Sequence, residues 1–162
     1  MHFNKNIYLG LGTNVGNRKR NILNAVLLLK KQKDIFVLKV SRIYETKAWG
    51  YTKQKNFYNA VVEIKTDINP HKLLVVCKNI EKKMLRRKNF KWGPRKIDID
   101  ILLYKNRRLR DKNLTIPHKY IRQRVFVLQP LIDLNGSLCI DGANIKSIAE
   151  KLGSESELSL IG

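Results

Sequence analysis

Residues 97–104 decide the fold, and their sequence is IDIDILLY. Three isoleucines alternate with Asp98 and Asp100 before the run becomes wholly apolar. Because successive side chains of a strand point to opposite faces, the isoleucines are expected to face a core. The two carboxylates then project together from the other face, roughly 6–7 Å apart along the strand. The run therefore predicts a strand that presents a pair of carboxylates.

Five further elements are expected before this strand. Asn17 and Asn69 can cap helices, and Pro70 follows as a favoured first helical residue. The elements are a strand over 6–12, a helix over 17–33, strands over 35–46 and 57–66, and a helix from 69. The order β-α-β-β-α-β predicts a ferredoxin-like α+β fold, an antiparallel sheet with helices on one face.

The remaining residues are additions to that unit. They contain a turn at Pro117-His118, a short mixed segment around Phe126, a turn at Asp141-Gly142 and a last helix over 145–152. No repeat, low-complexity tract or flexible linker interrupts the chain. We therefore expect a single domain over residues 1–162.

The composition is that of a globular protein, with 43% hydrophobic and 28% charged residues among 162. Cys77 and Cys139 have no metal-binding spacing, which is typical of reduced intracellular thiols. No apolar run is long enough to cross a membrane, and the N-terminus does not resemble a signal peptide. We therefore expect a cytoplasmic protein without membrane association.

The net charge of +20 favours binding to polyanions such as nucleic acid or nucleotides. A coding bias toward Lys, Ile and Asn is an alternative origin of the same charge.

The carboxylate pair has two interpretations. Hard oxygen ligands at this spacing suit Mg²⁺ that also holds substrate phosphates. A solvated polar face of an edge strand is the alternative. Arg95, three residues before Asp98, favours the first, since a phosphate bridged to the metal could reach it. The basic residues of 86–91 are either a solvated helix end or a lid over a triphosphate.

Two other groups can carry chemistry. His118 lies in a proline turn close to Arg122 and Arg124, so a phosphate contact is plausible. Phe57, Asn59 and Phe126 could stack on a flat heterocycle and bond its edge, although aromatic side chains in a strand are more often core. No Walker-type loop or strand–GxGxxG–helix unit is present.

The run over residues 92–102, WGPRKIDIDIL, resembles the signature of the 6-hydroxymethyl-7,8-dihydropterin pyrophosphokinase family. The resemblance extends to YLGLGTNVGNR near the N-terminus, NFYNA at 56–60, TIPH at 115–118 and RVFVLQPL at 124–131. It covers about residues 6–150. It implies the ferredoxin-like fold and the transfer of the β,γ-diphosphate of ATP to the hydroxymethyl oxygen of the dihydropterin, leaving AMP.

The resemblance also implies roles for individual residues. Asp98 and Asp100 would hold two Mg²⁺ ions, and the catalytic set would be Asp98, Asp100, Arg95 and Arg86. Residues at the nucleotide would be Glu81, Lys88, Ile101, Thr115, His118 and Arg124. Residues at the pterin would be Thr46, Ala48, Phe57, Asn59 and Phe126. The partners would be ATP and the dihydropterin. Apart from the resemblance, we expect the protein to be a monomer.

A ferredoxin-like RNA-binding domain is the alternative class. Such domains stack bases on aromatic side chains of their first and third strands. The third strand reads FYNAVVEIK and lacks the RNA-binding motif, and an unmetallated Asp pair would repel phosphates. Only weak, salt-sensitive and non-specific RNA binding is expected beside the enzymatic activity.

Overall fold

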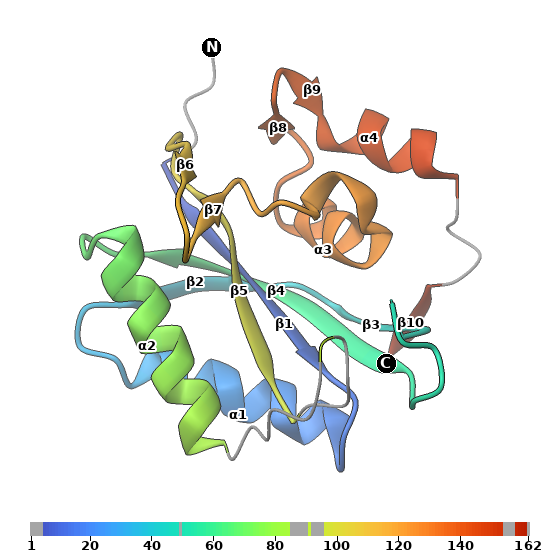
Figure 1. Ribbon diagram of the computed structural model, residues 1–162, viewed down its shortest axis with the longest axis horizontal. Helices are drawn as coiled ribbons and strands as arrows, with labels where there is room; N and C mark the ends of the chain where they lie inside the picture. Colours follow the sequence, from blue (N-terminus) through green and yellow to red (C-terminus); the bar gives the residue numbers. More distant parts are fainter. Residues whose placement is uncertain (1–4, 49, 85–90, 92–95, 154–157, 162) are drawn as a thin grey trace.

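The computed structural model describes residues 5–48, 50–84, 91, 96–153 and 158–161. Its centre is an antiparallel sheet with the strand order β10-β3-β4-β1-β5, in which β2 also pairs with β4 (Figure 1). The strands are β1 Ile7–Thr13, β2 Phe36–Val40, β3 Ile43–Thr46, β4 Phe57–Lys65, β5 Asp98–Tyr104 and β10 Ser159–Ile161. The arrangement confirms the expected ferredoxin-like α+β fold.

The strand predicted over 35–46 is two strands, β2 and β3, separated at Ser41 and Arg42. The Ser41 hydroxyl accepts a hydrogen bond from the Val61 backbone N–H at 2.8 Å and donates to the Arg42 carbonyl at 2.7 Å. A side chain thus takes the place of a backbone partner and interrupts the ladder. The alternation of apolar and polar residues does not reveal the break between the two strands, because Ser41 fits that alternation.

Two helices cover one face of the sheet, as predicted: α1 Arg18–Lys30 and α2 Pro70–Lys83. The Asn17 side chain accepts from the Arg20 N–H, and Asn69 accepts from the Lys72 N–H, so both predicted caps are present. α1 ends three residues before the predicted end at 33. The first hydrophobic core lies between these helices and the sheet. Helix α2 contributes Leu73, Cys77 and Ile80 to it, and Met84 follows directly after the helix.

The C-terminal segment covers the opposite face and builds a second core (Figure 1). Its elements are η1 Ile121–Gln123, α3 Val125–Asn135, β8 Cys139–Ile140, β9 Ala143–Asn144 and α4 Ile145–Leu152. The hairpin before it, β6 Leu109–Arg110 and β7 Thr115–Ile116, instead joins the first core through Ile116. The prediction of helices on one face is therefore correct only for α1 and α2. The last helix was predicted correctly. α3 was not, because it has no side-chain cap at Arg124 and contains Pro130.

A register shift in β5 serves the second core. Leu9 of β1 pairs with Ile101 and Tyr8 pairs with Leu103, so Leu102 is an extra residue. Leu102 and Leu103 consequently both reach the second core. A bulge of this kind redirects side chains without ending the strand. In the described part of the chain, no helix is long and apolar enough to span a membrane.

A polar group lies at the edge of the second core. Tyr8 is fully buried, and its hydroxyl donates to the Glu63 carboxylate at 3.1 Å. Asn6 donates to the same Glu63 oxygen at 2.5 Å. Burial, together with the negative charge of Glu63, raises the pKa of Tyr8 to about 12.

Leu73→Ala is expected to lower the free energy of unfolding by about 2–5 kcal/mol, because it leaves a cavity in the first core. Val75→Ala on the same helix is the matched control, since Val75 is 58% exposed and its loss costs less than about 0.5 kcal/mol. Urea unfolding measures both. Equal losses would contradict the assignment of the buried face of α2.

Tyr8→Phe is expected to remove a pH dependence of stability in alkaline solution. The native phenol keeps its proton to a pKa of about 12, whereas an unfolded tyrosine releases it near pH 10. The stabilisation is thus present below pH 10 and is lost as the pH rises from 10 to 12. Urea unfolding across that range should show a steeper loss for wild type than for Tyr8→Phe. In the exposed Tyr51→Phe control the steep loss remains, since Tyr8 is intact.

Candidate functional site

The carboxylate pair lies where the alternation of β5 predicts. Ile97, Ile99 and Ile101 are at most 3% exposed in the first core. Asp98 and Asp100 are half-buried on the opposite face, which faces α3. The two carboxylates stand on one face without an intervening side chain of their own strand.

Two glycines of β1 lie beside the carboxylates. Gly12 pairs with Asp98, and Gly10 pairs with Asp100. On its other side Gly12 pairs with Asn59 of β4, so one cross-strand row reads Asn59, Gly12, Asp98. Since strands are about 4.8 Å apart, Asn59 and Asp98 lie about 10 Å apart across the glycine. A Cβ at Gly12 would stand 3.3 Å from the Asn59 Oδ1 atom. Because Gly12 has no side chain, it leaves space between the Asn59 amide and the Asp98 carboxylate.

The two carboxylates of the pair influence each other's protonation. Burial, followed by the charge of Asp98, raises the pKa of Asp100 above the ordinary value. The positive charges of Arg124 and Lys78 act in the opposite direction. A cation between the carboxylates would relieve this repulsion.

His118 completes this side of the site. Its Nε2 atom lies 3.8 Å from the Asp100 carboxylate, and its side chain is 17% exposed. Burial and the nearby Arg124 guanidinium lower the pKa of His118 to about 4, so the ring is neutral at neutral pH. The Tyr120 backbone N–H donates to His118 Nδ1 at 3.2 Å. The ring proton is therefore on Nε2, where it can be donated to an oxygen in the site.

Arg124 and Phe126 come from the beginning of α3. Arg124 is 9% exposed, and its guanidinium carbon lies 4.9 Å from the Tyr120 ring and 5.6 Å from the Phe126 ring. Phe126 is half-buried in the first turn. The sequence predicted both as site residues but did not predict the helix that carries them.

The predicted pterin residues gather around the ends of β3 and β4. Asn59 donates to the Thr46 hydroxyl at 3.0 Å, and both side chains are buried. Phe57 pairs with Thr46 across the two strands and shares the face of Asn59. Ala48 follows β3 and is buried. The structure thus brings these four residues together, two strands away from the carboxylates.

Two residues that organise this region were not predicted. Asn14 donates to the Gln54 side chain at 2.8 Å and to the Lys55 carbonyl at 3.1 Å. Arg18 donates to the Asn56 carbonyl at 2.9 Å and lies 3.3 Å from the Glu45 carboxylate. Both therefore anchor the segment before β4. The sequence signal for both residues is the polar run after the first strand, which contributes to the family resemblance.

The predicted nucleotide residues are more dispersed. Glu81 is 2% exposed, and its carboxylate accepts from the Ile99 backbone N–H at 2.9 Å, which fixes α2 to the outer edge of β5. Lys78 lies 3.4 Å from the same carboxylate. The Ile101 side chain is in the first core, so only its backbone can meet a ligand. Thr115 is half-buried in β7. Arg86, Lys88 and Arg95 lie outside the described residues.

The two carboxylates suit a hard divalent cation that takes its other ligands from water and substrate. Among the described residues, no group of three or more His, Cys, Asp or Glu side chains could hold a metal ion. Mg²⁺ is commonly bound by one or two carboxylates together with water and substrate phosphates. Asp98 and Asp100, half-buried on one face, fit that description.

The chain is similar to proteins of a known family. Residues 8–136 match the family described as 7,8-dihydro-6-hydroxymethylpterin-pyrophosphokinase (HPPK). A 2-amino-4-hydroxy-6-hydroxymethyldihydropteridine pyrophosphokinase of Aquifex aeolicus is 47% identical over 128 residues, 79% of each chain. The protein of that name from Methylorubrum extorquens is 41% identical over 145 residues, 90% of this chain and 92% of its own.

Solved structures share the fold. The HPPK-DHPS of Plasmodium falciparum, crystallised with pterin and p-hydroxybenzoate, superimposes with a TM-score of 0.69 at 21% identity. The match covers 93% of this chain and 43% of that chain, so the chain spans less than half of the solved structure. The family match and the identities above 40% establish the conclusion: this chain belongs to the 7,8-dihydro-6-hydroxymethylpterin-pyrophosphokinase family.

Proposed function

We propose that this chain transfers the β,γ-diphosphate of ATP to the hydroxymethyl oxygen of 6-hydroxymethyl-7,8-dihydropterin, giving AMP and the pterin diphosphate. The observation that carries the proposal is the row Asn59, Gly12, Asp98 with Asp100 beside it. It offers an amide for a heterocycle edge about 10 Å from a carboxylate pair, as two strand spacings require. A bicyclic pterin fits between them with its hydroxymethyl group directed at the carboxylates.

Asn59 can recognise the pterin edge. One of its amide hydrogens is donated to the Thr46 hydroxyl, which fixes the orientation of the side chain. The second hydrogen and the Oδ1 atom leave one donor and one acceptor side by side. Such a pair matches the amide edge of a pterin ring. Phe57 and Phe126, from β4 and α3, are the proposed stacking partners of its two faces.

His118 and Arg124 are proposed to hold the nucleotide phosphates. A neutral His118 donates from Nε2 to a phosphate oxygen beside Asp100. Arg124 is buried beside the same carboxylate and supplies a permanent positive charge. Little covalent chemistry is required of the protein, because diphosphate transfer depends on positioning and charge neutralisation.

Asp98 and Asp100 are the proposed ligands of Mg²⁺. The cation supplies charge neutralisation for the triphosphate and for the acceptor oxygen. Glu81 holds the β5 backbone between the two carboxylates through the Ile99 N–H and so fixes their separation. Arg86, Lys88 and Arg95 stay predictions from the family resemblance. A single domain, a cytoplasmic location and a monomeric state stay predictions from the sequence. The RNA-binding alternative has no support from the family match.

Asp98→Asn and Asp100→Asn are each expected to lower the rate of AMP formation by about a thousandfold or more. The lost charge stabilisation is worth several kcal/mol, and each 1.4 kcal/mol is tenfold in rate. The protein is incubated with ATP, Mg²⁺ and the dihydropterin, and nucleotides are separated by chromatography. The exposed Asp67→Asn variant is the control and keeps full activity. ADP as the product, or turnover that persists in EDTA, would contradict the proposed reaction.

Phe126→Ala is expected to weaken pterin binding about tenfold or more, since stacking on an aromatic side chain is worth about 1–3 kcal/mol. Calorimetric titration with the pterin measures the effect, and ATP binding should change little. Phe36→Ala removes a phenyl ring that is 65% exposed on β2 and serves as the control. Equal losses for both ligands would mean that Phe126 supports the fold rather than the pterin.

A further inference from the structure

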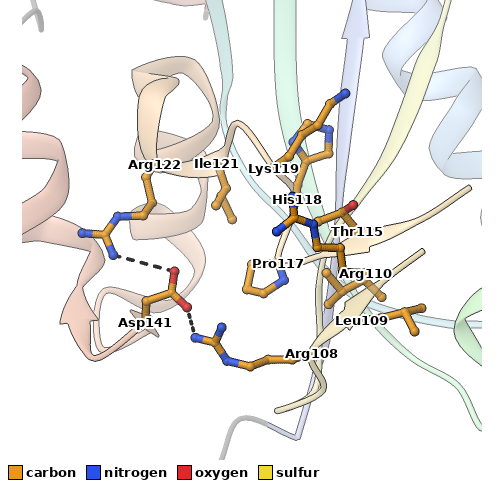
Figure 2. A pocket seen from close by; sticks show the side chains of 11 residues that line it. Arg108, Leu109, Arg110, Thr115, Pro117, His118, Lys119, Ile121, Arg122 and Asp141 are labelled. Carbon is orange, nitrogen blue, oxygen red and sulfur yellow. Dashed lines mark hydrogen bonds and ion pairs between the residues drawn. The ribbon is translucent and has the colours of Figure 1, made fainter. Parts of the chain in front are cut away.

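The proposed site has a nucleotide side and a pterin side. Figure 2 shows a cavity of about 340 Å³ on the nucleotide side, where Thr115 and His118 are among the lining residues. All of its lining residues lie outside α3. The pterin side depends on α3 instead, because the first turn of that helix carries Phe126, a proposed stacking partner. The position of α3 against β3 and β4 therefore sets the space that is left for the pterin ring.

The first turn of α3 is weakly stabilised from within the helix. The N-cap residue, Arg124, does not use its side chain to cap the helix. Pro130 lies inside α3 and has no N–H, so it cannot donate to the carbonyl of Phe126 four residues earlier. The orientation of the turn that carries Phe126 therefore depends on what the helix packs against.

One face of α3 is fixed by the hydroxyl of Tyr44. This hydroxyl donates to the Asp133 Oδ2 atom at 2.7 Å, and the Gln129 side chain hydrogen bonds to the same hydroxyl. Gln129 and Asp133 lie one turn apart, and Phe126 lies three residues before Gln129, so these three residues share one face of the helix. The contacts of Tyr44 thus fix the rotation of the face that carries Phe126.

Arg42 holds Asp133 in place as the acceptor. Its Nε and Nη2 atoms donate to the two oxygens of the Asp133 carboxylate at 3.2 and 2.7 Å. A two-point contact of this kind fixes the plane of a carboxylate. Burial, followed by the hydrogen bond to Asp133, raises the pKa of Tyr44 above its ordinary value, so the phenol keeps the proton that it donates.

The same tyrosine stands beside the proposed pterin amide. Tyr44 of β3 pairs directly with Asn59 of β4, so the two side chains share one face of the sheet. Both are buried. Asn59 in turn donates to the hydroxyl of Thr46, the next residue of β3 on that face. Tyr44 therefore links the strands that carry Asn59 to the helix that carries Phe126.

We propose that Tyr44 is a positioning residue for the pterin: its hydroxyl holds α3 where the Phe126 ring can stack on the heterocycle that Asn59 binds. This inference rests on the proposed function, since it requires the pterin to lie against Phe126. Tyr44 acts through Phe126 rather than by touching the pterin, because Gln129 and Asp133 already occupy its hydroxyl.

The test measures the affinity of the full chain for 6-hydroxymethyl-7,8-dihydropterin by calorimetry, with Mg²⁺ and a non-hydrolysable ATP analogue at saturation. Tyr44→Phe is expected to weaken pterin binding roughly three- to tenfold, because it removes one hydrogen bond to a carboxylate and so releases the face that carries Phe126. Affinity for the ATP analogue alone should stay within about twofold of wild type, since sites without shared contacts respond independently.

Tyr104→Phe is the matched control. Tyr104 is also buried, and its hydroxyl donates to the Ile68 carbonyl on the side of the first core. The substitution therefore removes a comparable hydroxyl from the other face of the sheet. Its pterin affinity should stay within about twofold of wild type, whatever stability it loses. Thermal unfolding verifies that both variants are folded.

A double-mutant cycle separates positioning through Phe126 from a general structural role. In the Phe126→Ala background, Tyr44→Phe should weaken pterin binding by no more than about a further twofold, because the ring that Tyr44 positions is already absent. Additive losses would overturn the proposal, and so would equal losses in Tyr44→Phe and Tyr104→Phe. A wild-type protein that binds no pterin would overturn the proposed function as well. Additive losses in a protein that does bind the pterin overturn the role of Tyr44 alone.

Discussion

The pleat of β5 is the constraint on which the rest of the structure depends. Alternation sends Ile97, Ile99 and Ile101 into the first core and leaves Asp98 and Asp100 on the other face. The apolar burial that holds the strand in its register therefore also holds the carboxylates in place. A slip of one residue would bury both acids and expose the isoleucines, at a cost that no local contact could offset.

The sheet face opposite the first core packs against the second core at one end and carries the candidate site at the other. Toward one end, Leu102 and Leu103 of β5 join Tyr8 and Val61 in the second core beneath α3 and α4. Toward the other end, Gly12 lies between Asn59 and Asp98 without a side chain, whereas Leu102 packs against Gly10. The proposed pterin and nucleotide sites occupy this open end, where β3, β4 and the beginning of α3 meet. One sheet thus carries the proposed substrate sites and also anchors α3, whose Phe126 is a proposed stacking partner of the pterin.

The predicted fold was largely correct because its signals are local. Alternation in 97–104, the caps at Asn17 and Asn69, and the buried stripe of α2 each lie within one element. The errors involve contacts between distant residues. The break at Ser41 requires the backbone of Val61, 20 residues away. The helix α3 has neither cap nor clear periodicity, and its burial against β4 decides its structure.

The sequence by itself determined that Asp98 and Asp100 share one face, because the strand period is a property of the backbone. It also indicated which residue types gather in the site, through motifs that resemble a family. Only the tertiary structure decided that Gly12 separates Asn59 from Asp98, since strand pairing across β4, β1 and β5 sets that row. The same holds for the approach of His118 Nε2 to within 3.8 Å of Asp100, since the two residues belong to different segments. The distances between these side chains decide what the site can do, and they are set by the packing of segments that are distant in the sequence.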